Sequence, residues 1–168
     1  MSDAATATAT KPARPAAPQQ PQAVQTLEIR KESVIDAPVE IVWESILEEL
    51  GPVGIPGEAG KSMPMKLEAW PGGRWFRDLG AGTGHLWGHV QVIKPPKLLE
   101  IAGPLFMSYP ATNHLQYRLA DEPGAKTRLT FAHRAIGLIA PDHASGVQQG
   151  WNEILERIRK TAARRAGR

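Results

Sequence analysis

The stretch LEAWPGGRWFRDLGAGTGHLWGHVQVIKPPKLLEIAGP, residues 67–104, predicts short antiparallel strands joined by tight turns. Two segments within it, residues 71–73 (PGG) and 80–84 (GAGTG), are rich in glycine. Glycine reaches positive φ without steric cost, so both segments favour turns. Around them apolar and polar residues alternate, which is typical of half-buried antiparallel strands. The stretch therefore predicts the centre of an antiparallel sheet.

The flanking sequence extends this sheet and adds two helices. We expect a strand from residue 26 to about 35, then a helix that starts at Asp36-Ala37-Pro38 and ends before Gly51. Residues 51–64 are rich in Gly and Pro and predict a loop, with one helical turn near residues 58–61. On the last helix, which opens at Pro141, Val147, Trp151, Ile154 and Ile158 form one apolar stripe. The remaining expected strands are residues 65–70, 74–79, 84–94, 97–102, 112–121 and 125–135.

Composition indicates one globular domain in a chain of 168 residues, with 42% apolar and 22% charged residues. We expect a disordered Ala/Pro/Thr-rich leader at residues 1–25, the folded domain at 26–162 and a basic tail at 163–168. The chain has no cysteine and no long apolar run, so we expect a cytoplasmic protein without disulfides or a membrane span. Six of the 20 Lys and Arg residues lie within residues 157–168, leaving residues 26–156 mildly acidic. This uneven charge argues against nucleic-acid binding by a folded face.

Four motifs, in this order, resemble the START/Bet v 1-like helix-grip superfamily (SRPBCC), in the branch of the C-terminal domain of the Hsp90 ATPase activator. They are residues 35–38 (IDAP) followed by Val42-Trp43, residues 70–73 (WPGG), residues 88–98 (GHVQVIKPPKL), and Gly150-Trp151 before Leu155. The resemblance covers residues 27–162. It implies an α+β fold in which about seven antiparallel strands curve around the long C-terminal helix and enclose an apolar cavity. Relatives of this kind include lipid and hormone carriers, polyketide cyclases and co-chaperone domains, so the fold alone does not name the function.

Motifs for catalysis, metals or cofactors are not recognisable in the chain. Residues 80–84 superficially match a phosphate-binding loop, but a strand and not a helix follows them, so we predict a hairpin turn. His85 and His89 are four residues apart on a strand, which separates them by roughly 13 Å. One zinc ion with bonds of about 2.1 Å cannot bridge that distance. Glu48 and Glu49, at a helix end, are expected to be solvated.

The inner faces of the strands and the last helix supply the candidate ligand pocket. On the strand around residue 88 we place Leu86 and Val90 inside and Trp87 outside. Tyr117 and His133 each put one polar group on an otherwise apolar inner face, where they either orient a ligand or bond internally. The full predicted set is Leu67, Trp75, Leu86, Val90, Leu115, Tyr117, Leu119, Phe131, His133, Val147, Trp151 and Ile154. Residues 51–64 and 104–110 are expected to form the mouth.

Three functions fit this pattern. The first is binding of a small hydrophobic or amphipathic molecule between the sheet and the C-terminal helix. The second is an enzyme of the cyclase or hydratase kind, with His133 as acid or base. The third is a chaperone-accessory or stress module that binds a protein partner, which predicts a filled core and an exposed apolar patch. The sequence leaves the oligomeric state open.

Overall fold

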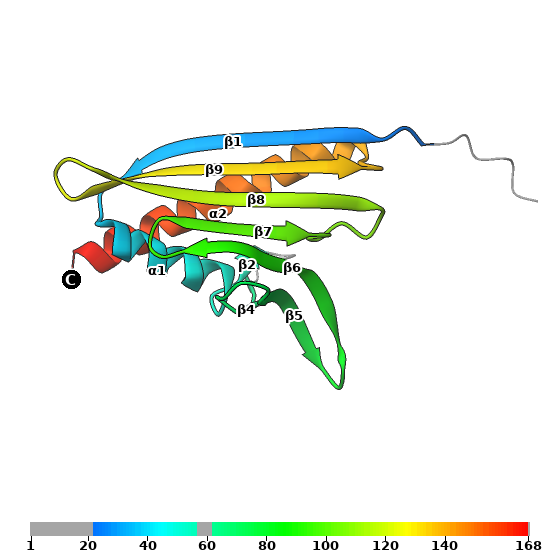
Figure 1. Cartoon of the computed structure of the whole chain (residues 1–168), viewed down its shortest axis with the longest axis horizontal. Helices are drawn as coiled ribbons and strands as arrows, with labels where there is room; N and C mark the ends of the chain where they lie inside the picture. Colours follow the sequence, from blue (N-terminus) through cyan, green and yellow to red (C-terminus); the bar gives the residue numbers. More distant parts are fainter. Residues whose placement is uncertain (1–21, 57–61, 168) are drawn as a thin grey trace, which may run out of the picture.

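A computed structural model describes residues 22–56 and 62–167 and confirms the predicted α+β architecture. Within these residues the main sheet has seven antiparallel strands in the order β1-β9-β8-β7-β6-β5-β4, and the long helix α2 lies along its concave face (Figure 1). The helices are α1 (Val39–Leu50) and α2 (Pro141–Ala166). The strands of the main sheet are β1 (Gln25–Ile35), β4 (Lys66–Leu67), β5 (Arg74–Gly80), β6 (Thr83–Lys94), β7 (Leu98–Gly103), β8 (Ala111–Glu122) and β9 (Lys126–Gly137).

The glycine-rich segment at residues 80–84 forms the predicted hairpin turn. Gly80 of β5 pairs with Thr83 of β6, and the two residues between them, Ala81 and Gly82, have φ values of 50° and 74°. Positive φ at both central positions matches the right-handed twist of the two strands, as in type I′ hairpins. The β5–β6 hairpin extends well beyond the rest of the sheet (Figure 1).

The loop predicted at residues 51–64 contains a small hairpin that the sequence did not reveal. Strands β2 (Ile55–Pro56) and β3 (Ser62–Met63) pair antiparallel as a separate two-stranded sheet. The helical turn expected near residues 58–61 lies outside the described residues, as does most of the predicted leader (residues 1–21). At the other end of the chain, α2 continues through Ala166, so residues 163–166 form its last turn.

Two apolar helix faces and the inner face of the sheet form the core. On α1 the buried residues include Val42, Ile46 and Leu50, and on α2 they include Trp151 and Ile158. Burial of each such side chain contributes about 1.5–3 kcal/mol, before the cost of ordering the chain. No helix in the two described ranges is long and apolar enough to cross a membrane.

Charged side chains join the two helices at their C-terminal halves. The expectation that Glu49 is solvated was wrong, because its side chain is only 5% exposed. Its Oε2 lies 2.8 Å from a guanidinium nitrogen of Arg157, which gives an ion pair, although the geometry is not that of a hydrogen bond. Its other oxygen, Oε1, accepts a hydrogen bond of 2.7 Å from the Thr161 hydroxyl. Nearby, Arg165 forms ion pairs with Glu44 and Glu48. The basic end of α2 therefore packs against the acidic end of α1.

Candidate functional site: an apolar cavity beside the C-terminal helix

A cavity of about 310 Å³ opens between the first half of α2, strand β6 and the β2–β3 hairpin. Its wall is apolar, apart from one histidine and the indole N–H groups of two tryptophans. The lining residues are Ile55, Met63, Trp87, Phe106, His143, Gly146, Val147, Gly150, Trp151 and Ile154. The volume lies at the lower end of the range of about 300–1,000 Å³ that is usual for small-molecule sites.

Helix α2 supplies six of the ten lining residues because its apolar stripe faces inward here. Val147, Trp151 and Ile154 were predicted as pocket residues, and all three line the cavity. Gly146 and Gly150 lie one turn apart on the same helix, and a Cβ added at either would meet nothing within 4 Å. Because these two positions have no side chain, the helix leaves space for the cavity there.

Substitutions at these two glycines are expected to change the stability of the protein. Gly146→Ala and Gly150→Ala are each expected to raise the free energy of unfolding by about 0.5–1 kcal/mol, because alanine favours the helix and its methyl group meets no atom. Urea denaturation of the wild type and both variants measures the change in the free energy of unfolding. A loss of stability in either variant would show that the helix surface is filled at that position.

The predicted inward and outward faces of β6 were wrong near Trp87. Trp87 is 7% exposed and lines the cavity, whereas Leu86 is 45% exposed on the opposite side. The cause is a β-bulge: Trp75 pairs with Gly88 and Phe76 with Leu86, so that Trp87 is an extra residue between them. A bulge shifts the alternation of side chains by one position. Leu86 is thereby excluded from the cavity wall.

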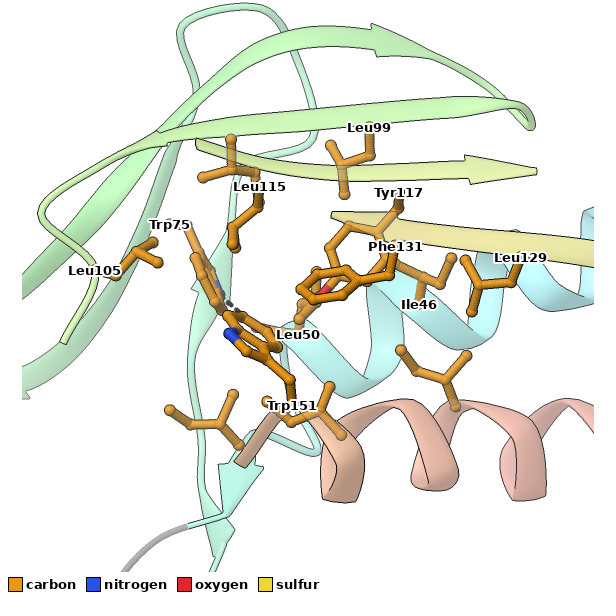
Figure 2. Close-up of a cluster of buried hydrophobic side chains, with 14 of the residues drawn as sticks. Ile46, Leu50, Trp75, Leu99, Leu105, Leu115, Tyr117, Leu129, Phe131 and Trp151 are labelled. Carbon is orange, nitrogen blue, oxygen red and sulfur yellow. Dashed lines mark hydrogen bonds between the residues drawn. The ribbon is translucent and has the colours of Figure 1, made fainter. Parts of the chain in front are cut away.

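Most of the other predicted pocket residues form the packed core beside the cavity. Trp75 is fully buried, donates its indole N–H to the Leu50 carbonyl at 2.7 Å, and contacts Trp87 edge to face at 5.0 Å. Tyr117, Phe131 and Trp151 lie in a row between the sheet and α2 (Figure 2), with ring centroids 5.0 and 4.8 Å apart. Val90, Leu115 and Leu119 are also buried, and Leu67 is half-buried at the sheet edge.

His133 is bonded within the protein at both ring nitrogens. Trp151 donates its indole N–H to Nδ1 at 2.9 Å, and Nε2 lies 2.8 Å from Oδ1 of Asn113. An indole only donates, so Nδ1 must accept, and the proton of the neutral ring is on Nε2. The amide of Asn113 is fixed in turn by the carbonyls of Gly103 and Pro104, at 3.2 and 3.1 Å.

Burial keeps His133 neutral, so that it is not suited to transfer protons. His133 has no exposed surface, and desolvation lowers its pKa to about 4. With both nitrogens bonded, it has no free atom to offer a ligand or substrate. Its observed role is to hold the Trp151 ring, which forms part of the cavity wall. Of the two interpretations left open by the sequence, the geometry favours internal bonding.

Tyr117, the second polar candidate, is enclosed by the core. Its hydroxyl group has no hydrogen-bond partner among the described residues, and burial raises its pKa. It pairs across β8 and β9 with Phe131, one layer behind Trp151, and does not line the cavity.

Polar groups at the cavity come instead from residues that the sequence did not indicate. His143, in the first turn of α2, lines the cavity, and its Nδ1 lies 2.6 Å from the Tyr109 hydroxyl. Phe106 stacks edge to face on His143 at 5.7 Å. Phe106 and Tyr109 come from the segment 104–110, and Ile55 and Met63 from 51–64. Residues of both segments predicted to form the mouth therefore lie at the cavity.

An antiparallel sheet that curves around a C-terminal helix, with a cavity between them, defines the helix-grip class of proteins. The family profile described as "Activator of Hsp90 ATPase homolog 1-like protein" matches residues 36–163. The chain belongs to this family, within the START/Bet v 1-like helix-grip superfamily.

Solved structures with the same fold have low sequence identity. CalU16 from Micromonospora echinospora is 20% identical, with 84% of this chain and 87% of that one covered and a TM-score of 0.54. A protein of unknown function from Staphylococcus aureus, SA2116, is 10% identical, with 86% and 98% covered and a TM-score of 0.62. Mll3558 from Rhizobium loti is 17% identical, with 83% and 99% covered and a TM-score of 0.62. At these identities the likeness shows the fold alone. A search of curated proteins found no match.

Proposed function

We propose that this protein binds a small hydrophobic or amphipathic molecule in the cavity between β6 and α2. The observation that carries the proposal is the cavity of about 310 Å³ with its nearly continuous apolar wall. Burial of apolar ligand surface is worth about 25 cal/mol per Å² before the costs of association. The aromatic rings of Trp87, Phe106 and Trp151 supply much of that surface.

The alternative functions have weaker support. An enzyme that uses His133 for proton transfer lacks a free nitrogen on that residue. A protein-interaction module is supported by exposed apolar residues on and beside the β5–β6 hairpin, namely Trp70, Leu79 and Leu86. That module predicts a filled core, whereas the cavity beside α2 has open space next to Gly146 and Gly150.

Filling the cavity from α2 tests the proposal. Gly150→Leu places a branched side chain in the open space and is expected to abolish binding of the fluorescent amphiphile 1-anilinonaphthalene-8-sulfonate while the helix remains folded. Fluorescence titration measures the affinity, and circular dichroism with thermal unfolding checks the fold.

The matched control is Gln148→Leu, which adds the same side chain to an exposed position of the same helix outside the cavity. This variant is expected to bind the probe with wild-type affinity. Equal affinity of the wild type and both variants would place the probe elsewhere and contradict the proposal.

A further inference from the structure

Two nitrogen atoms on the cavity wall lack partners in the described part of the chain. One is Nε1 of Trp87, and the other is Nε2 of His143. The other indole at the wall, that of Trp151, already donates its N–H to His133. In a wall that is otherwise apolar, unpartnered polar groups set the orientation and chemistry of a ligand.

The contact between Tyr109 and His143 determines which hydrogen-bonding role Nε2 plays. Burial raises the pKa of Tyr109, so the hydroxyl keeps its proton, and His143 Nδ1 is its one acceptor among the described residues. When this hydroxyl donates to Nδ1, the proton of the neutral ring is on Nε2. In the protonated ring Nε2 is a donor as well. With Tyr109 as the donor to Nδ1, Trp87 and His143 both offer N–H groups to the cavity, and its described lining then has no free side-chain nitrogen or oxygen acceptor.

A cation lies next to the same cavity. The Arg77 guanidinium contacts the sulfur of Met63, a lining residue, at 3.4 Å. Within residues 22–56 and 62–167 it has no carboxylate partner, whereas the neighbouring Asp78 is paired with Lys66 at 2.7 Å. A negatively charged group near Met63 would therefore meet positive charge.

From this arrangement we infer that the ligand is a flat apolar molecule with a hydrogen-bond-accepting oxygen, which His143 and Trp87 bind directly and for which Tyr109 is a positioning residue. The inference rests on the proposed function and adds the chemical class of the ligand. Three aromatic side chains favour a flat body, and the two N–H donors favour an acceptor on it, of which a carbonyl or carboxylate oxygen is the strongest kind.

Two probes of nearly the same shape test this inference. Menadione and 2-methylnaphthalene share the methylated two-ring body, and only menadione has carbonyl oxygens. The chain has no cysteine with which the quinone could react. We expect menadione to bind at least about fivefold more tightly, the ratio that one net hydrogen bond supplies. We also expect it to shift the indole ¹H–¹⁵N signal of Trp87, one of five tryptophans in the chain.

Variants separate binding residues from positioning residues. His143→Phe is expected to reduce the affinity ratio of the two probes to about one, because it removes a donor and keeps an aromatic ring. Tyr109→Phe is expected to lower the ratio and to shift the ¹⁵N resonances of His143 towards a mixture of tautomers, a signal that a purely structural role would not change. His85→Phe, at an exposed position outside the cavity, should leave the ratio unchanged.

A third probe distinguishes the two sources of the oxygen. If 2-naphthoate binds more tightly than menadione and Arg77→Gln removes that advantage, the oxygen belongs to a carboxylate. If menadione binds more tightly, it belongs to a neutral carbonyl. Either result supports the inference. Equal affinity of the wild type for menadione and 2-methylnaphthalene would overturn the inference and leave the proposed function standing, whereas no binding of any probe would overturn both.

Discussion

His133→Leu is expected to lower the free energy of unfolding by about 3 kcal/mol at pH 7. The substitution removes the acceptor of the Trp151 indole and the donor to Asn113, and both of these groups lie in the buried interior. Each unsatisfied buried group costs about 1–3 kcal/mol. Chemical denaturation measures the change, with His85→Leu as a control because His85 is exposed. A loss below about 1 kcal/mol would mean that the chain of hydrogen bonds does not form.

The same histidine predicts how stability depends on pH. Burial lowers the pKa of His133 from 6.5 to about 4, so unfolding takes up a proton between these values. The stability that the wild type has with a neutral His133 is fully present above pH 6.5 and is lost as the pH falls towards 4. Its full extent is about 3 kcal/mol. His133→Gln, whose amide can accept from Trp151 and donate to Asn113, is expected to lose less stability between pH 7 and 5 than the wild type. Identical pH profiles would contradict the assignment of a neutral buried ring.

The second large effect is expected at the buried ion pair between α1 and α2. Arg157→Met leaves the Glu49 carboxylate, 5% exposed, without its cation and is expected to cost about 3–5 kcal/mol. The double variant Glu49→Leu/Arg157→Met should recover most of that loss, because no buried charge then remains. Urea denaturation of the two single variants and the double variant gives the coupling free energy.

An exposed pair on the same helices provides the comparison. Glu44 is 65% exposed and lies 2.9 Å from Arg165, so Glu44→Leu is expected to cost less than about 1 kcal/mol. If the losses in unfolding free energy of the Arg157 and Glu49 single variants simply add in the double variant, the two side chains are not coupled. That result would contradict a stabilising ion pair between them.

Much of the fold could be predicted from local patterns in the sequence. Alternating residues and Gly/Pro turns give the strands, and the stripe from Val147 to Ile158 gives the packed face of α2. These signals are local, and they survive in the structure because sheet and helix faces pack where their apolar residues lie.

The cavity wall was less predictable because its key features are not local. The bulge at Trp87 depends on how two strands pair, and a single strand's alternation does not reveal it. His143 becomes notable only through Tyr109, which is 34 residues away in the sequence. Conversely, His133 appeared as a free polar group on an inner face, and only its two partners in the structure show that it is bonded internally.

The central claim is that the cavity beside α2 holds a small apolar molecule. Native mass spectrometry of freshly purified wild-type protein and of Gly150→Leu, followed by denaturation and extraction, tests it most directly. A discrete small molecule is expected to leave the wild type on denaturation and to be absent from Gly150→Leu. A wild-type protein that is empty after purification and binds none of a panel of fatty acids, sterols and aromatic polyketides would contradict it.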